Sequence, residues 1–303
     1  MTARSDPGSP SALVLSMLER VDGELRSLVA RETEGSPDSV AAPVRRAVLS
    51  PGKRIRPLLL LGGYRAVGGD WPDATLLSCA VELVHAYSLV HDDLPCMDDD
   101  VLRRGHPTLH VEFGVRTATL AGAVLMPLAV RTICRAADQM GLANETAGRL
   151  VETLTVASGG HGMVGGQLLD LAAEGREISA DELEAIHVGK TAALIAASVT
   201  MGAIAGGADE ETIAHLDVFG LRLGLAFQTV DDILDLTGSD AELGKTSGRD
   251  AALRKATYPA LFGLDGAERF SRRLAEEASR QLTIVHNGDV LRDIVEYVIE
   301  RTH

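Results

Sequence analysis

Five aspartates stand within nine residues of this chain, at positions 92, 93, 98, 99 and 100. Carboxylates held so close together repel one another unless cations neutralise them. A second acidic cluster contains Asp231, Asp232 and Asp235, and each cluster comes directly after an apolar run, 81–90 or 221–230. One acidic run is usually a solvated surface. Two runs embedded in apolar sequence predict a site for hard divalent cations, which prefer oxygen ligands.

The spacing within each cluster decides which carboxylates can share a site. In the second cluster, Gln228 and the three aspartates fall at i, i+3, i+4 and i+7, on one face of a helix. Such a polar stripe is costly to bury, so it must border bulk water or a wet, cation-containing cavity. In the first cluster, Pro95 disfavours a regular helix. A regular helix would return Asp99 to the face of Asp92, whereas a distorted turn would bring Asp98 inward, so spacing leaves both as alternatives.

Basic residues lie near both clusters. The segment 50–57 carries three of them just before an apolar helix, where cations oppose the helix dipole, so we expect anionic groups beside them. The alternative is a surface basic turn. Arg103 and Arg104 follow the first cluster. They either neutralise its carboxylates or bind the same metal-bound anion, since guanidinium forks suit phosphate oxygens.

Three other stretches have distinctive composition. Residues 237–250 are polar, glycine-rich and long enough for a lid, and the cations around them are Lys245, Arg249 and Lys255. The glycine-rich stretch 158–170 has neither the preceding strand nor the Gly-Lys-Ser/Thr of a phosphate loop, so it predicts close backbone packing or space for a ligand. Ser179 and Glu182 predict a capping box for the helix that carries Lys190.

Composition limits the partners. The 303-residue chain is 46% hydrophobic and has a formal net charge of −14. This charge argues against nucleic acid or an anionic membrane as partner, although metals and local basic clusters can still serve a small anionic substrate. Three cysteines without metal-ligand spacing indicate reduced thiols in a cytoplasmic protein. No apolar run reaches the roughly 18 residues that cross a bilayer, so we expect no membrane span.

Apolar residues recur at helical spacing almost throughout, and no segment alternates like a strand, so we expect an all-α fold. No linker divides the chain, which predicts one domain over residues 11–303 after a disordered tail, 1–10. The expected helices cover 11–30, 39–49, 58–66, 73–93, 114–140, 144–157, 209–236, 259–285 and 289–301, with another beginning near 179. We expect the 114–140 helix to be buried.

These motifs resemble the trans-prenyltransferases of the polyprenyl diphosphate synthase family, most closely the bacterial-type farnesyl diphosphate synthases. The resemblance runs through most of the chain, in blocks that follow the family's order: 52–57, 85–110, 165–171, 190–191, 227–238, 244–245 and 255–259. Its most specific part is the pairing of Asp-Asp-x4-Asp with a later Asp-Asp-x2-Asp.

The resemblance implies an all-α antiparallel helical bundle around a deep central cavity, usually as a homodimer. It implies that the aspartates of two motifs bind Mg²⁺: Asp92, Asp93, Asp98, Asp231, Asp232 and Asp235. It thereby favours Asp98 over Asp99. About three Mg²⁺ ions are implied per active site with substrate bound, with Mn²⁺ able to substitute. These ions would bridge to an allylic diphosphate.

The resemblance also implies two diphosphate sites. The residues that match contacts to the allylic diphosphate are Arg103, Lys190, Thr191, Gln228 and Lys245. Those that match the pocket for isopentenyl diphosphate are Lys53, Arg56, His85 and Arg104. Gly52 and Lys255 belong to the substrate-binding set as a whole. The residues expected to carry catalysis are Asp92, Asp93, Asp98, Arg103, Lys190, Asp231 and Lys245. They would stabilise the departing diphosphate while isopentenyl diphosphate attacks the allylic cation.

Product length depends on what lies below Asp92. Tyr87 and Ser88 precede it by about one helical turn, where a growing tail would pass. The phenol of Tyr87 would form a floor and favour a farnesyl (C15) product, and the alternative is geranylgeranyl (C20). Val101 and Ala123 stand where many relatives carry aspartate. These two departures bear on product length or rate rather than on the metal motifs.

Two other functions would also use acidic motifs. A terpene cyclase lines its pocket with aromatic rings that stabilise cations, whereas only 3% of this chain is aromatic and its second motif is rich in aspartate. A non-catalytic regulatory subunit typically lacks one acidic motif, and both are present here. A prenyl diphosphate synthase is therefore the favoured function.

Overall fold

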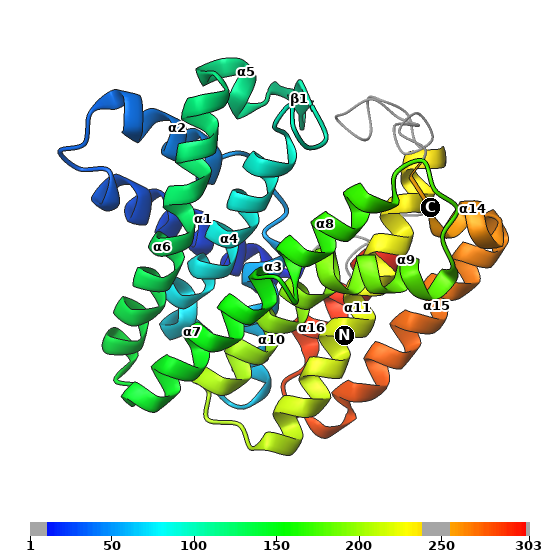
Figure 1. Ribbon diagram of the computed structural model, residues 1–303. Helices are drawn as coiled ribbons and strands as arrows, with labels where there is room; N and C mark the ends of the chain where they lie inside the picture. The colour runs from blue at the N-terminus through cyan, green and yellow to red at the C-terminus, as the bar shows by residue number, and fades with distance from the viewer. Residues whose placement is uncertain (1–10, 238–254, 301–303) are drawn as a thin grey trace.

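The computed structural model describes residues 11–237 and 255–300, and nearly all of this backbone is helical (Figure 1). The N-terminal half contains α1 (Ala12–Glu32), α2 (Asp38–Val48), α3 (Ile55–Ala66), η1 (Trp71–Ala74), α4 (Thr75–Asp92), α5 (Leu109–Phe113) and α6 (Val115–Met140). The C-terminal half contains α7 (Asn144–Ser158), α8 (Met163–Ala173), α9 (Ala180–His187), η2 (Val188–Ala192), α10 (Ala193–Ala205), α11 (Glu210–Thr237), α14 (Tyr258–Phe262), α15 (Leu264–Gln281), η3 (Leu282–Ile284) and α16 (Asp289–Glu300). The all-α prediction is confirmed.

Several details of the secondary structure differ from the sequence prediction, among them α8, which is not one of the expected helices. A short antiparallel hairpin follows the first acidic cluster, and its strands β1 (Leu102–Arg103) and β2 (His106–Pro107) have two residues each. The helix expected over 259–285 is divided at Gly263, whose φ of +71° suits glycine and ends α14. The predicted tail, most of the predicted lid and Lys245 lie outside the described residues.

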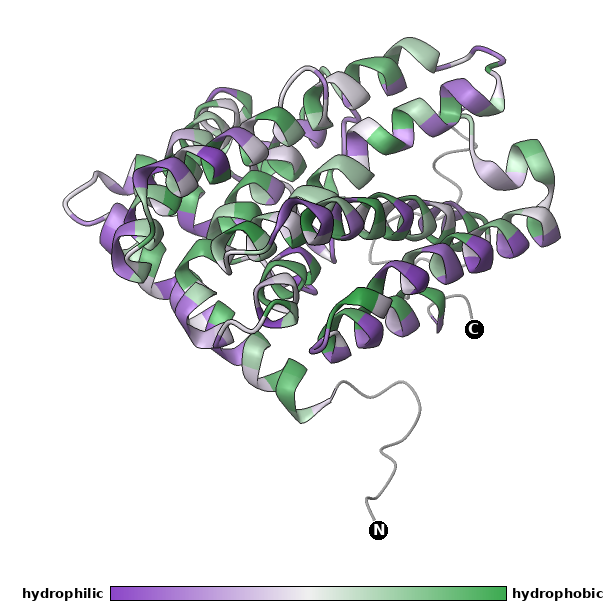
Figure 2. Ribbon diagram, turned by 90° about the horizontal axis from the view of Figure 1, so that it is seen from below, coloured by the Kyte–Doolittle hydropathy of each residue, from purple (hydrophilic) through white to green (hydrophobic). Residues whose placement is uncertain are grey.

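The centre of the bundle is α10, in which every residue from Leu194 to Ala205 is buried. A helix that is apolar on all sides needs neighbours that cover it, and α10 packs against α3 and α11. Glycines allow the close approach, because a Cβ on Gly63 of α3 or Gly202 of α10 would overlap a backbone oxygen of the facing helix. Further out, α4 packs on α6 and α11 on α15, and polar and apolar segments alternate along the outer helices (Figure 2).

The prediction that the 114–140 helix is buried is wrong for one of its faces. Ile133 of α6 is fully buried, but Leu120 is 66% exposed. Periodicity could not reveal this, because the outward positions are apolar too. The exposed apolar residues of α6, α7 and α8 are Val115, Leu120, Val124, Val156, Val164, Leu168 and Leu169.

Three helical stretches meet the length and composition of a membrane span: Trp71–Asp92, Val115–Met140 and Ala180–Ala205. This finding corrects the expectation that no apolar run is long enough. In the first and third stretches, 72% and 78% of the apolar window is buried inside the protein, so core packing accounts for it. The share for Val115–Met140 is 44%, which reflects the exposed face of α6.

Candidate active site

One cavity of about 310 Å³ is lined by residues of α3, α4, α8, η2 and α11 and by the segment after α4. This volume is in the range of small-molecule sites. The predicted site residues on its wall are Lys53, Arg56, His85, Ser88, Asp92, Asp98, Arg103, Arg104, Lys190, Thr191, Gln228, Asp231 and Lys255. The two acidic motifs therefore face the same cavity, with Asp92 and Asp98 from one motif and Asp231 from the other.

The turn after α4 decides which aspartate of the first cluster faces the cavity. The helix ends at Asp92, and the chain folds back so that the N–H of Asp98 donates to the carbonyl of Asp92 at 2.9 Å. Asp98 is thereby placed on the cavity wall, whereas Asp99 is exposed and has a left-handed φ of +50°. The distorted turn anticipated around Pro95 is present.

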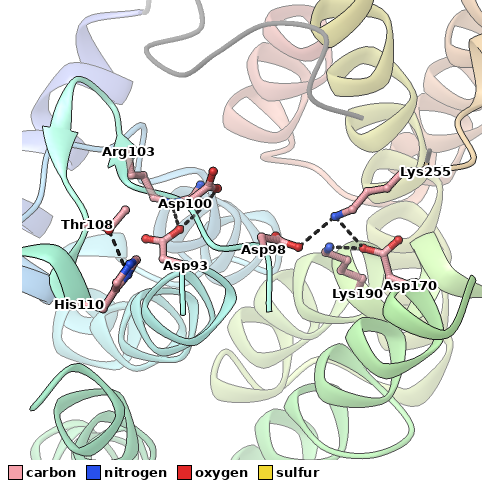
Figure 3. Close-up of polar contacts among 9 residues, drawn as sticks. All are labelled: Asp93, Asp98, Asp100, Arg103, Thr108, His110, Asp170, Lys190 and Lys255. Atoms are coloured by element: carbon pink, nitrogen blue, oxygen red, sulfur yellow. Dashed lines mark hydrogen bonds and ion pairs between the residues drawn. The ribbon is translucent and has the colours of Figure 1, made fainter. Parts of the chain in front are cut away.

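Cations already lie among these carboxylates (Figure 3). Lys255 Nζ donates to Asp98 Oδ1 at 3.0 Å and to Asp170 Oδ2 at 3.5 Å. Lys190 Nζ donates to the same Asp170 oxygen at 2.5 Å. Burial raises the pKa of Asp170, but Lys190 and Lys255 outweigh burial and hold that pKa below its ordinary value. Asp170 stands in a block that carries the family resemblance, yet its type and spacing alone gave it no role.

The acidic end of the cavity fits a hard cation. Burial raises the pKa of Asp92 to about 6, and Asp98 adds to the rise although Lys190 opposes it. Within residues 11–237 and 255–300, no three His, Cys, Asp or Glu side chains converge into a metal site of their own. Asp92, Asp98 and Asp231 supply carboxylate oxygens to one cavity, and Asp98 already attracts an ammonium group. A Mg²⁺ ion held here would complete its coordination with oxygens from substrate or water.

Asp93 is turned away from the cavity. Its Oδ1 accepts a hydrogen bond of 2.7 Å from Arg103 Nε, and Arg103 also donates to Asp100 Oδ2 at 3.0 Å (Figure 3). Burial raises the pKa of Asp93, although Arg103 opposes the shift. In this conformation, mutual neutralisation describes Arg103 better than contact with a shared anion.

The spacing predicted that the whole acidic stripe of α11 borders water or a cation-containing cavity. Asp231 lies on the cavity wall, but Asp232 and Asp235 do not. Asp232 is buried, where its Oδ2 accepts from the N–H of Tyr258 at 3.1 Å and its Oδ1 from Gln228 Nε2 at 3.0 Å. Asp235 is buried as well and is not on the wall. The cost of burying Asp232 is therefore offset in part by the backbone N–H of Tyr258, rather than by water or cations alone.

Close backbone packing positions Lys190 and Thr191. Both residues belong to the π-helical turn η2, a form of helix that often occurs at functional sites. A Cβ on Gly166 of α8 would overlap the backbone nitrogen of Lys190, which confirms the packing expected of the glycine-rich stretch. Thr191 Oγ1 then donates to Gln228 Oε1 at 2.8 Å, which joins η2 to α11 at the cavity.

Another group of wall residues, called the basic end below, carries Arg56, His85 and Arg104. Burial lowers the pKa of Arg56 to about 10, and burial together with nearby arginines lowers that of His85 well below its ordinary value. Arg56 Nε and His85 Nδ1 are buried and have no hydrogen-bond partner among residues 11–237 and 255–300. The guanidinium of Arg104 donates to the Pro51 carbonyl, and a Cβ on Gly52 would meet this guanidinium, which would then have to shift. This end presents donors suited to an anion.

Arg54, Glu82 and Gln167 are polar wall residues to which the sequence assigned no individual role in the site. Gln167 is 8% exposed, and neither amide atom has a hydrogen-bond partner in the part of the chain that the structure describes. Glu82 is a buried acidic residue within an otherwise apolar run. That contrast was the available signal, because a buried charge requires a partner.

The residues predicted to set product length are only partly on the wall. Ser88 lines the cavity. The ring of Tyr87 packs edge-on against His91, with centroids 4.6 Å apart, beside the wall rather than on it. Its role as a floor stays a prediction. Val101 is 58% exposed and Ala123 is also exposed, so both departures from the family pattern lie at the surface.

Comparison with known proteins identifies the family. A family model described as polyprenyl synthetase matches residues 37–298. The chain belongs to the polyprenyl synthetase family. It is 45% identical over 247 residues to a chloroplastic geranylgeranyl pyrophosphate synthase of Catharanthus roseus, covering 81% of this chain and 69% of the relative. It is 42% identical over 269 residues to farnesyl diphosphate synthase of Bacillus subtilis, covering 88% and 90%.

A solved structure extends the likeness to the fold. The geranyltransferase of Helicobacter pylori, in complex with magnesium and isoprenyl diphosphate, superposes with a TM-score of 0.82 at 31% identity, over 99% of this chain and 98% of that one. The fold of this polyprenyl synthetase is thus the isoprenoid-synthase bundle, and the protein is a prenyltransferase of the prenyl diphosphate synthase type. Its relatives include both farnesyl and geranylgeranyl synthases.

Proposed function

We propose that this prenyltransferase condenses isopentenyl diphosphate head-to-tail with dimethylallyl and geranyl diphosphates, and that its main product is farnesyl diphosphate. The observation that supports this most is one cavity with a basic end and an acidic end. Arg56 and His85 belong to the first group of wall residues and Asp92, Asp98 and Asp231 to the second, although the charge of Asp231 still reaches Arg56. Such a cavity suits two anionic substrates, one bound mainly by basic side chains and the other bound together with Mg²⁺. Geranylgeranyl diphosphate is the alternative product.

Each end has a proposed substrate. Isopentenyl diphosphate binds at the basic end, through Lys53, Arg56, His85 and Arg104, next to Gly52. The allylic diphosphate binds at the acidic end, through Arg103, Lys190, Thr191, Gln228, Lys245 and Lys255. Aspartates of the two motifs would hold Mg²⁺, which when bound would supply positive charge to that diphosphate. For Asp93, Asp232 and Asp235 this role requires their carboxylates to turn from the partners they have here.

The residues act on the leaving group. As the allylic C–O bond breaks, its electron pair goes to the diphosphate, and the cationic side chains of Lys190 and Arg103 stabilise the growing negative charge. The double bond of isopentenyl diphosphate then forms the new C–C bond, and a proton passes to the released diphosphate to restore an alkene. The cavity wall has to keep water from the cation.

One assay tests the proposal against its rivals. Purified protein is incubated with Mg²⁺, isopentenyl diphosphate and either dimethylallyl, geranyl or farnesyl diphosphate, and the dephosphorylated products are sized by chromatography. Farnesol as the main product is the expected result, and reactions with EDTA are the control. Geranylgeraniol as the main product would favour the alternative. Cyclic hydrocarbons would indicate a cyclase, and no product from any primer would refute the proposed function.

The wall of the cavity weighs against a cyclase. Among the described wall residues, Phe227 supplies the single phenyl, phenol or indole ring. Stabilising a migrating carbocation requires several such faces. A wall of carboxylates and cations suits transfer between two diphosphates better.

We also propose a cytoplasmic homodimer. The apolar residues exposed on α6, α7 and α8 support the dimer, because large apolar patches on soluble proteins usually mark interaction sites. All three cysteines, Cys79, Cys96 and Cys134, are free thiols. Free thiols support a reducing compartment.

A further inference from the structure

Arg54 holds an unusual position at the start of α3. It is 7% exposed and has a left-handed φ of +50°, although it is not glycine. Such backbone is strained for a residue with a side chain and persists only where the surroundings enforce it. Lys53 and Arg56, on either side of it, both line the cavity.

Three anchors enforce this conformation. Arg54 Nε donates to Asp22 Oδ1 of α1 at 2.9 Å, and Nη2 donates to the Ser50 carbonyl at 3.0 Å. Nη1 donates to Glu82 Oε1 of α4 at 2.6 Å. The guanidinium therefore ties the 50–56 segment to two helices and to its own first residue. The bond to Glu82 is the shortest and most buried of the three, since the side chain of Glu82 is 5% exposed and that of Asp22 is 40% exposed.

Glu82 itself is an anomaly on this wall. It carries negative charge at the end of the cavity where we place a diphosphate, and its field also reaches Arg56 and Arg104, whose pKa values it raises against the effect of burial. A carboxylate beside an anion site weakens anion binding by direct repulsion. Its presence therefore requires a benefit of another kind.

We propose that Glu82 is a positioning residue for the isopentenyl diphosphate pocket, acting through Arg54. By holding Arg54 it fixes the 50–56 segment, so that Lys53 and Arg56 line the cavity before substrate arrives. Pre-organised donors bind an anion better than mobile ones, because less conformational entropy is lost on binding. This inference rests on the proposed function, which supplies the substrate of the basic end.

The direction in which Glu82→Gln changes the KM for isopentenyl diphosphate distinguishes a positioning role from simple charge balance. If Glu82 only balances the charge of Arg56 and Arg104, Glu82→Gln removes a repulsion and lowers the KM for isopentenyl diphosphate. If it positions the segment, the same change releases Arg54 and raises that KM. We expect a rise of about tenfold or more, with the KM for geranyl diphosphate changed by less than about threefold.

The experiment measures both KM values for the wild type, Glu82→Gln, Arg54→Gln and the double variant, with Mg²⁺ and the second substrate saturating. Because Glu82 acts through Arg54, the two single changes should not add in the double variant. Isothermal titration with isopentenyl diphosphate measures the same loss without turnover. Glu32→Gln is the matched control, since this carboxylate pairs with Arg135 at 3.1 Å away from the cavity wall.

The outcomes are distinct. A lower or unchanged KM for isopentenyl diphosphate in Glu82→Gln, equal rises in both KM values, or additive effects would overturn the positioning role. Glu82→Asp, which keeps the charge, should recover part of the loss, and it serves as the test if Glu82→Gln does not fold. Absence of prenyl transfer in the wild type would instead refute the proposed function, whatever the variants do.

Discussion

Lys255 Nζ lies 3.0 Å from Asp98 Oδ1, although the two residues are 157 positions apart in the chain. The same ammonium group reaches Asp170, which also binds Lys190, so two lysines and two carboxylates form one chain of contacts across the cavity (Figure 3). The first acidic motif is thus partly neutralised by the protein itself. A Mg²⁺ ion has to share Asp98 with this lysine or displace it.

Lys255→Gln should destabilise the protein in EDTA more than in Mg²⁺. The side chains of Lys255 and Asp98 are only 11% and 14% exposed, so losing the ammonium leaves carboxylates facing one another. We expect a fall in Tm of about 3–6 °C in EDTA, which millimolar Mg²⁺ with inorganic diphosphate largely reverses. Thermal melts measure this. Arg149→Gln breaks an exposed pair with Glu210 and is the control. Equal falls in both conditions would contradict the sharing of Asp98.

Asp98→Asn should lower kcat by about 10²–10³-fold, since it removes a charge that faces the proposed diphosphate site. Asp99→Asn is an unusually close control, because Asp99 follows Asp98 directly but is exposed and is not on the cavity wall. It should stay within about threefold of the wild type. Steady-state kinetics at saturating Mg²⁺ measure both. Similar losses in the two variants would mean that the cluster acts through net charge rather than through placement.

Asp92→Ala and Asp231→Ala, one from each motif, should each lower turnover by orders of magnitude. Both side chains are on the cavity wall, Asp92 on α4 and Asp231 on α11. The measurement is product formation with excess Mg²⁺, with circular dichroism to verify the fold. Near-normal turnover in either variant would refute the assignment of that motif.

Tyr87→Ala should increase the share of products longer than farnesyl. The half-buried phenol lies one turn before Asp92 and packs on His91, and removing it would open space beside Ser88 on the wall. Chromatography of the dephosphorylated products gives the ratio. Tyr64→Ala, which removes a half-buried ring from α3, controls for a general loss of packing. An unchanged product spectrum would count against the floor.

Helix positions and the choice of chemistry could be predicted from sequence, because apolar periodicity and acidic spacing are local patterns. The side-chain partners could not. Asp232 shares its helix face with Asp231, yet it turns to the N–H of Tyr258, 26 residues later. Arg103 pairs with Asp93, one of two roles that the sequence left open, and several large apolar residues of α6 stay exposed among the described residues. Each outcome depends on which segments meet in space, and one sequence does not record that.

Leu168→Arg should convert the proposed dimer to a monomer. Leu168 of α8 is 60% exposed, and exposed apolar residues on α6 and α7 accompany it. A charge buried in an apolar interface is strongly unfavourable. Size-exclusion chromatography with light scattering reports the mass. Ile284→Arg changes an apolar residue that is 40% exposed outside this group and should leave the mass unaltered. A monomeric wild type, or a dimer that survives in Leu168→Arg, would argue against this surface.

His187→Phe should reduce the loss of stability in acid. Burial lowers the pKa of His187 to about 4, below the value near 6.5 that histidine has in an unfolded chain. Between these values the unfolded state binds a proton that the folded state does not, so His187 lowers stability as pH falls from about 6.5 to about 4. Above this window it contributes no pH dependence, and the full loss is on the order of 3 kcal/mol.

Urea unfolding at pH 7 and at pH 4.5 measures this difference. The buried ring of His187 lies 5.2 Å from that of Tyr258, centroid to centroid, so phenylalanine suits the site and the slope with pH can be compared directly. The exposed His161→Phe is the control, and we expect it to keep the wild-type slope. If His187→Phe loses as much stability as the wild type on acidification, the pH dependence must come from other buried groups.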